Sequence, residues 1–236
     1  MLKPPLFLVA AFIGVVFVWS VSSAAEEHIV FRDNFNRDDA DAVGNEWSSK
    51  GKTLLKDNAA FFQVKGEEFR PRIRHVFPAQ KDGKFTASFR MDWLRESEGS
   101  WGFYMQLGHS SELPRFLIRK DDLAKGIGVN LVWGGGEFVD SQERSSFGYI
   151  KDGKFKALFI ANDAQVKKSI AREPVVTIDV DLDSGTYRLE FNGKTYSDLP
   201  LASKGPIDTI RFITDGCSAT GFSRSSIDDV KITREK

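Results

Sequence analysis

The sequence contains a single cysteine, Cys217, and only three histidines in 236 residues. One cysteine excludes a disulfide bond within the chain, so stability must come from packing, with or without a bound metal ion. The histidines, His28, His75 and His109, lie far apart, and no Ser-His-Asp or Cys-His arrangement points to nucleophilic catalysis. We expect all three to be surface residues rather than bases or metal ligands.

The chain also has no excess of charge of either sign, since lysine plus arginine and aspartate plus glutamate both number 33. A neutral chain lacks the basic footprint of nucleic-acid-binding proteins and the polybasic surface of proteins that attach to anionic membranes. We therefore expect no nucleic-acid partner.

Long apolar runs are missing after the first 25 residues, and the one run within them extends from Leu6 to Val21. Lys3 precedes this run and small residues follow it, which is the order of a secretory signal peptide. The run is shorter than the ~20 residues that a bilayer-spanning helix needs. We predict a signal peptide over residues 1–25, with a retained anchor as the alternative. The protein is then secreted, periplasmic or on the cell surface, with no membrane span after cleavage.

Helical periodicity is scarce as well, and strand-like alternation takes its place. The stretch 175–199 shows it best, because every second residue is apolar at Val176, Ile178, Val180 and Leu182, and again at Tyr187, Leu189 and Phe191. Ser184-Gly185 and Asn192-Gly193 are two-residue turn signals, since glycine accepts the positive φ that such turns need. The pattern predicts three strands joined by two hairpins.

A two-residue loop at Ser184-Gly185 fixes the pairing of the strands on either side of it. Leu182 then lies opposite Tyr187, and Asp181 lies opposite Arg188 on the other face. The same pairing places Asp179 opposite Glu190, which is an unfavourable pair of like charges. This misfit needs solvent, an arginine from another strand or a cation.

Short strands are predicted throughout the chain, over 28–35, 59–65, 69–77, 84–94, 101–107, 115–119, 128–133, 137–140, 155–160, 207–214 and 226–233. Closely spaced strands without alternating helices argue for an all-β sandwich. About 210 residues follow the signal, enough for one such domain, which we predict over residues 26–236.

Three motifs together resemble those of bacterial concanavalin A-like (laminin G-like) jelly-roll domains. They are FRDNFNR at 31–37 with VGNEW at 43–47, the hairpin DVDLDSGTYRLEFNG at 179–193, and the ending IDDVKI at 227–232. The resemblance implies a two-sheet antiparallel jelly-roll sandwich with one convex and one concave sheet, and a ligand on the concave face or at its rim. It implies no single function, because this fold hosts lectins, glycosidases, lyases and adhesion modules.

Laminarinase-like glycosidases of this fold carry Glu-x-Asp-x-Glu on a concave strand, where two carboxylates flank the scissile bond. The nearest match is Asp179-x-Asp181-x-Asp183, in which all three residues are aspartates and Arg188 neutralises the middle one. A solvated strand face is the plainer interpretation. If the chain is a glycoside hydrolase or lyase, Asp179, Asp181 and Glu190 are the catalytic candidates.

A row of arginines is a candidate ligand site. Arg70, Arg72 and Arg74 share one face of a predicted strand, and we expect Arg90 to continue the row on the neighbouring strand. Guanidinium groups bind carboxylates and sulfates with two parallel hydrogen bonds. A uronic-acid or sulfated polysaccharide suits such a face, and ion pairing within the sheet is the alternative.

Aromatic side chains offer stacking surfaces for sugar rings, and Trp101, Tyr104 and Trp133 are the candidates. Trp101 and Trp133 adjoin glycines, where the chain turns or is approached closely. Burial in the core is the alternative for each of them.

A structural calcium ion is the remaining candidate. In several sandwiches of the family that this chain resembles, calcium ties the first and last strands together, and an aspartate of the closing strand is a ligand. Asp228 matches that position and Asp33 lies in the opening motif. The oxygen ligands that calcium prefers are compatible with both residues.

These patterns predict an exported, non-catalytic module that binds carbohydrate or mediates surface adhesion. A polysaccharide-active enzyme of the same fold is the alternative, and a structural envelope protein without a small ligand is a third.

Overall fold

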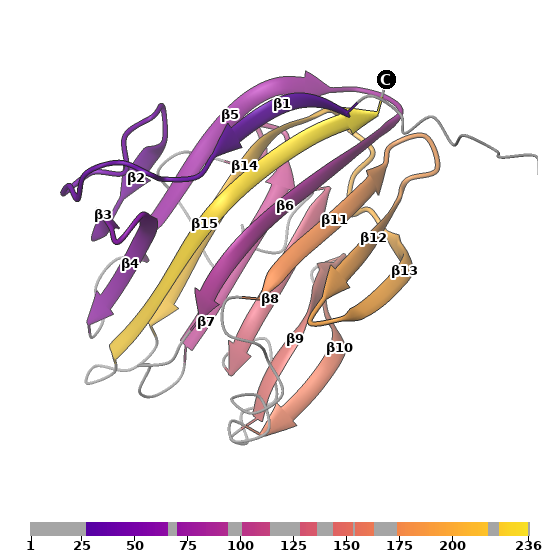
Figure 1. Cartoon of the computed structure of the whole chain (residues 1–236). Coiled ribbons are helices and arrows are strands. Elements are labelled where there is room, and N and C mark those ends of the chain that lie inside the picture. The colour runs from indigo at the N-terminus through magenta and orange to yellow at the C-terminus, as the bar shows by residue number, and fades with distance from the viewer. Residues whose placement is uncertain are drawn as a thin grey trace, which may run out of the picture.

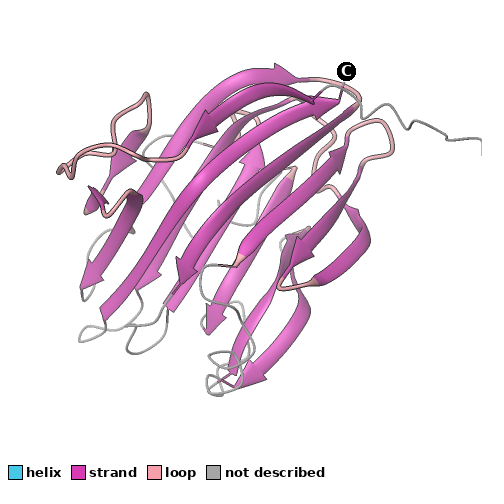
Figure 2. Cartoon of the chain, in the orientation of Figure 1, coloured by secondary structure: helices cyan, strands magenta, loops and turns pink. Residues whose placement is uncertain are grey.

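The computed structural model describes residues 27–65, 70–93, 101–113, 128–135, 144–152, 154–162, 174–216 and 222–235. Every named element in this part of the chain is a β-strand, and the strands form two antiparallel sheets (Figures 1 and 2). The predicted all-β, two-sheet sandwich is therefore confirmed. A search of the described residues for a helix long and apolar enough to cross a bilayer finds none.

The eight-stranded sheet contains the two hairpins formed by residues 175–200. Its spatial order is β13 (Lys194–Pro200), β12 (Thr186–Phe191), β11 (Val175–Asp181), β6 (Lys84–Trp93), β15 (Phe222–Glu235), β4 (Ala59–Lys65) and β3 (Thr53–Lys56), and β1 (Glu27–Asp33) also pairs with β15. Figure 1 shows β1, β15, β6 and β11 side by side, so the first and last strands of the described chain are neighbours.

The seven-stranded sheet lies behind it in Figure 1. Its order is β10 (Lys154–Asn162), β9 (Arg144–Lys151), β8 (Val129–Gly135), β7 (Trp101–Gly108), β14 (Ile207–Gly216), β5 (Arg72–Gln80) and β2 (Ser48–Lys50). The sequence did not predict β2, β3 or β9. The strands predicted over 115–119 and 137–140 lie outside the described residues.

One large core fills the space between the sheets. Alternation along each strand directs every second side chain inward, and the inward set is rich in aromatic rings: Phe35, Phe62, Phe85, Phe89, Phe103, Trp133, Phe147, Phe191 and Phe212. Full burial of one such ring stabilises the fold by roughly 1.5–3 kcal/mol. A chain with one cysteine is thus held together by packing.

The pairing of β11 with β12 differs from the prediction by two residues. Asp181 lies opposite Thr186 and Asp179 lies opposite Arg188, because the turn contains four residues, 182–185. The turn is closed by a hydrogen bond of 2.9 Å from the Gly185 amide to the Asp181 carbonyl. The predicted Asp179–Glu190 clash therefore does not exist, and Asp179 instead has a cationic partner.

The structure also corrects the expectation that His75 is a surface residue. Its imidazole is 6% exposed and stacks on Phe31 of β1 with ring centroids 3.8 Å apart. The Trp47 ring lies against the same imidazole, at 5.3 Å between centroids. Burial lowers the pKa of His75, and the nearby carboxylates of Glu46 and Asp33 offset this only in part.

This buried imidazole makes stability depend on pH. An unfolded histidine takes up a proton near pH 6.5, whereas the folded chain resists protonation until the pH reaches the lowered pKa of His75. His75 thus costs no stability above pH 6.5, and stability falls as the pH drops from 6.5 towards that lower value. We expect His75→Phe, which keeps the ring stack, to remove this part of the acid sensitivity.

Urea denaturation at pH 7.5 and pH 5.5 measures the effect. The exposed His28 supplies the control, because His28→Asn is expected to keep the acid sensitivity of the parent chain. Equal losses of stability in the parent and in His75→Phe between the two pH values would contradict the assignment.

Candidate functional site

The outer face of the seven-stranded sheet carries a row of polar side chains across its centre. Cross-strand pairing places one residue from each of five strands side by side: Ser48, Arg74, Arg211, Gln106 and Asn130. Their sequence neighbours Ile73 and Phe212 are core residues, so the row, called here the central row, faces away from the core.

A buried arginine and a buried glutamine lie at the middle of the central row. Arg211 and Gln106 are both 0% exposed. Arg211 Nε donates a hydrogen bond of 2.8 Å to Gln106 Oε1, and Nη2 donates to the same oxygen. A buried charge is tolerated only where hydrogen bonds compensate for lost hydration. The amide therefore holds the guanidinium plane in a fixed orientation.

A second arginine is the direct cross-strand partner of the first. Arg74 on β5 lies opposite Arg211 on β14 and is half-buried. Its Nη2 donates to the Ser110 carbonyl at 3.2 Å. Arg72 lies two residues away on the same face and is opposite Lys50 of β2. Like charges directly opposite each other are unfavourable unless other groups compensate them, and Arg72, Arg74 and Arg211 all have further partners.

The turn that follows β7 forms the rim next to Arg74. Asp208 accepts hydrogen bonds from the Ser110 amide at 2.6 Å and from Ser110 Oγ at 2.8 Å. His109 Nδ1 lies 2.6 Å from Ser111 Oγ, and its Nε2 is 3.7 Å from Asp208. These contacts hold the Ser110 carbonyl in place, and that carbonyl in turn positions Arg74.

Two predicted ligand residues, Arg72 and Arg74, share this face with a third candidate, Tyr104, which is separated from Arg72 by Ile213. Tyr104 is 5% exposed and packs with Val132, Ile150 and Ile213 on the outer face. Its ring covers Gly102, where an added Cβ would come within 3.0 Å of the ring. Tyr104 therefore belongs to a buried apolar cluster on this face.

The predicted continuation of the arginine row is wrong. Arg90 belongs to β6 in the other sheet, where its Nη2 pairs with Asp229 at 2.8 Å. The residue that continues the row is Arg211, some 140 positions from Arg72 in sequence. Arg211, Gln106 and Asn130 could not be predicted as site residues, because single polar residues within apolar strands carry no local signal.

The stacking role predicted for Trp133 is wrong as well. Its indole ring is 0% exposed and lies between the sheets, with the Phe147 centroid 4.8 Å away and the Phe103 centroid 5.5 Å away. A ring enclosed by other rings cannot stack on a sugar. Trp101 begins β7, but its side chain lies outside the described residues.

The carboxylates proposed for catalysis lie on the opposite side of the molecule, on the outer face of the eight-stranded sheet. Asp179 accepts hydrogen bonds from Thr86 Oγ1 at 2.8 Å and from Arg188 Nε at 2.8 Å. Hydrogen bonds from Ser184 lower the pKa of Asp181 despite some desolvation. A general acid needs a raised pKa, so the lowered pKa of Asp181 is the opposite of what catalysis would require.

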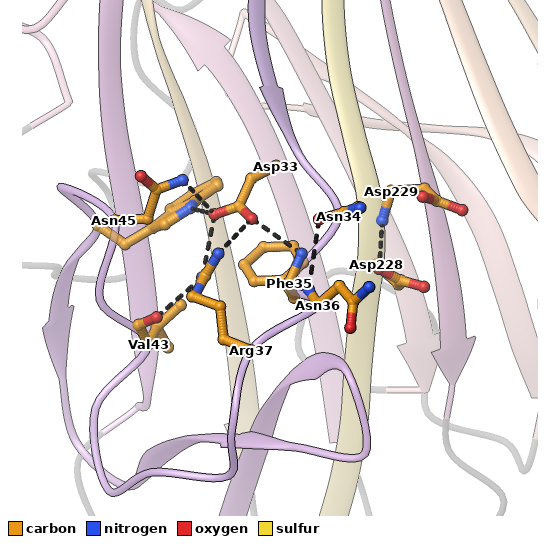
Figure 3. Close-up of polar contacts among 10 residues, drawn as sticks. Asp33, Asn34, Phe35, Asn36, Arg37, Val43, Asn45, Asp228 and Asp229 are labelled. Atoms are coloured by element: carbon orange, nitrogen blue, oxygen red, sulfur yellow. Dashed lines mark hydrogen bonds and ion pairs between the residues drawn. The ribbon is translucent and has the colours of Figure 1, made fainter.

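Asp33, one of the two predicted calcium ligands, has a different role, which Figure 3 shows. Its carboxylate is 2% exposed and accepts five hydrogen bonds of 2.7–3.1 Å, from the Phe35 amide, two Arg37 nitrogens, Asn45 Nδ2 and Trp47 Nε1. Burial alone would raise its pKa, but these donors outweigh burial and lower it. Both oxygens face N–H groups, which does not fit a cation.

Asp228, the other predicted ligand, lies on β15 and accepts a hydrogen bond of 2.6 Å from the Asp229 amide. A search of the described residues for three or more clustered metal-ligating side chains finds no such group. Calcium binding at Asp228 stays a prediction.

The opening motif is therefore a structural unit built around Asp33. Phe35 and Asn45 both have positive φ, 50° and 48°, a conformation that is uncommon for residues other than glycine. Their hydrogen bonds to Asp33 hold these turns in place, and Arg37 Nη2 adds a 3.0 Å bond to the Val43 carbonyl.

No protein-family model matches the chain, and no curated protein matches it in sequence. Among solved structures, the CBM2 module of Lactobacillus casei BL23 phage J-1 evolved Dit superposes with a TM-score of 0.61 and 12% identity. The alignment covers 89% of this chain and 96% of that one. LamAcat from Zobellia galactanivorans gives a TM-score of 0.53 at 11% identity over 88% of this chain and 98% of that one.

A sialidase gives a TM-score of 0.58 at 10% identity, and the alignment covers 88% of this chain but only 19% of the sialidase. Identities this low show the fold alone. The fold is the concanavalin A-like, galectin-like jelly-roll sandwich, as the three sequence motifs implied.

Proposed function

We propose that this protein binds an anionic carbohydrate without cleaving it, on the outer face of the seven-stranded sheet. The observation that carries the proposal is the half-buried Arg74, which donates to the Ser110 carbonyl and lies opposite the buried Arg211. An oriented guanidinium matches the carboxylate of a uronic acid or a sulfate ester.

The nature of the surrounding residues supports a sugar rather than a free inorganic anion. Ser48, next to Arg74 in the central row, is partly exposed, and a hydroxyl group can both donate to and accept from sugar hydroxyls. Tyr104 lies one row away and is buried, so the proposed contacts come from the charged and hydroxyl groups around Arg74. Structures of the same fold include a CBM2 module and a sialidase, which favours carbohydrate by analogy.

A non-catalytic role is favoured over the enzyme alternative. The candidate carboxylates Asp179 and Asp181 are held by Arg188, Thr86 and Ser184, and they lie on the other sheet from the central row. We also propose that residues 1–25 direct export of the protein, because the anionic polysaccharides that it would bind are extracellular.

Binding to an array of uronic-acid, sulfated and neutral glycans tests the function. We expect the parent chain to retain anionic glycans and not neutral ones. Arg74→Gln should weaken that binding about tenfold or more, since a charge-assisted hydrogen bond contributes roughly 1.5–3 kcal/mol. Arg74→Lys should also weaken it, because a lysine cannot form two parallel bonds.

Arg188→Gln is the matched control, because it removes one exposed cation from the other sheet and should leave glycan binding unchanged. Melting curves establish that each variant is folded. Equal retention of neutral and anionic glycans, or unchanged affinity in folded Arg74→Gln, would overturn the proposal.

A further inference from the structure

A second basic hollow lies on the outer face of the eight-stranded sheet, on the far side of the sandwich from the central row. It has a volume of about 320 Å³, which is at the lower end for small-molecule sites. Its lining includes Arg32, Ser88, Arg90, Val175, Asp229 and Lys231. These residues come from β1, β6, β11 and β15, four separate parts of the sequence.

The hollow carries more positive than negative charge. Three cations line it against one carboxylate, and that carboxylate is already paired, since Asp229 Oδ2 lies 2.8 Å from Arg90 Nη2. Lys231 reaches Glu27 at 2.7 Å, at the edge of the hollow. Arg32 is exposed, and no described residue forms a hydrogen bond or an ion pair with it.

The strand register brings two of these cations together. Arg32 of β1 lies directly opposite Lys231 of β15, and the next residue across the sheet is Ser88 of β6. Like charges at directly opposite positions are unfavourable, and an anion placed over them reverses the sign of the interaction. The Ser88 hydroxyl can donate a further hydrogen bond to the same anion.

An apolar side chain completes the hollow. Val175, opposite Arg90 on the neighbouring strand, is 53% exposed and is among the three most exposed large hydrophobic residues in the described chain. Cations on one side and an apolar group on the other suit an anionic sugar, which has a charged group and an apolar ring face. A small inorganic anion would make no use of Val175.

We propose that this hollow is a second binding site for the carboxylate or sulfate group of an anionic glycan. The inference rests on the proposed function, because it assigns the same class of ligand to the opposite face. Since the two sites lie on opposite sheets, one molecule bridges two glycan chains and cross-links them.

NMR titration of the ¹⁵N-labelled protein tests the site with three probes: trigalacturonate, sulfated maltotriose and neutral maltotriose. We expect shifts of the amides of Arg32, Ser88 and Lys231 with one or both anionic probes and none with maltotriose. The first two probes distinguish a carboxylate from a sulfate site. The double variant Arg32→Gln/Lys231→Gln should lose these shifts and keep those around Arg74.

Arg188→Gln again serves as the control, because it removes a cation from the same outer face but outside the hollow. Shifts confined to the seven-stranded sheet would overturn the second site and leave the proposed function intact. Shifts confined to the hollow would overturn the site at Arg74 instead. Equal shifts with maltotriose would contradict the assignment of an anionic glycan as the ligand.

Cross-linking is measured by light scattering with long polygalacturonate or dextran sulfate chains. We expect scattering to rise with the parent chain and with Arg188→Gln, and to stay at the level of the free polymer with Arg32→Gln/Lys231→Gln. Equal scattering from the double variant and the parent would contradict bridging through the hollow.

Discussion

Asp33→Asn is expected to lower the free energy of unfolding by about 2–4 kcal/mol, because it leaves several buried donors without an acceptor. Asp33 Oδ2 accepts from Arg37, Asn45 and Trp47, and Oδ1 accepts from Arg37 and the Phe35 amide. An asparagine keeps the shape but turns an NH₂ group towards one of these sets. At least two N–H groups then face another N–H, and the Arg37 guanidinium loses its counter-charge.

Guanidinium-chloride denaturation at pH 7 measures the loss, and Asp82→Asn is the control. Asp82 is 72% exposed in its ion pair with Arg234, and exposed pairs contribute at most about 1 kcal/mol. The pH dependence gives a second check. Since the pKa of Asp33 is lowered below 3.8, its contribution is complete above that value and is lost as the pH falls through the lowered pKa. A loss below 0.5 kcal/mol, flat down to about pH 3, would contradict the role assigned to Asp33.

The residues of the opening motif were recognisable in the sequence, but the role of the Asp33 carboxylate was not. The spacing of Asp33, Arg37 and Trp47 was visible, and it correctly indicated the fold. Whether a carboxylate faces a cation or five N–H groups depends on how two turns fold back on the strand. Positive φ at Phe35 and Asn45 brings those donors inward, and a phenylalanine gives no sign of that conformation in the sequence.

The hairpin at 175–191 shows a different limit. Alternation has a period of two, so a shift of two residues leaves every side chain on its predicted face. The faces were therefore predicted correctly while each cross-strand pair was wrong. The unfavourable Asp179–Glu190 pair was the one sign of the error, and the observed register replaces it with Asp179 opposite Arg188.

Burial on both faces limited the prediction of the seven-stranded sheet. Trp133 faces the core, yet its neighbour Val132 on the outer face is only 3% exposed. Alternation of polar and apolar residues is weak in such strands, so the sequence cannot say which side of β8 faces the core. Weak alternation is also the reason why β9 was not predicted. Its residues on the outer face are Ser146, Gly148 and Ile150.

This assignment of faces decides what a substitution at Trp133 does. Trp133→Ala is expected to lower the free energy of unfolding by about 3–5 kcal/mol, as large aromatic truncations in a core do. The ring lies within 6.4 Å, centroid to centroid, of four aromatic neighbours: Phe89, Phe103, Phe147 and Phe191. Rigid strands on both sides prevent the sandwich from closing over the cavity.

Trp133→Phe separates packing from ligand binding, because it keeps a ring in the same space. The Trp133 Nε1 group is buried and has no hydrogen-bond partner in the described part of the chain. Removing an unsatisfied buried donor recovers roughly 1–3 kcal/mol, which offsets much of the lost volume. We expect this variant to differ from the parent by less than about 1.5 kcal/mol in urea denaturation. We also expect it to bind glycans as the parent does. A folded Trp133→Phe protein that no longer binds would show that the indole contacts the ligand, contrary to its place between the sheets.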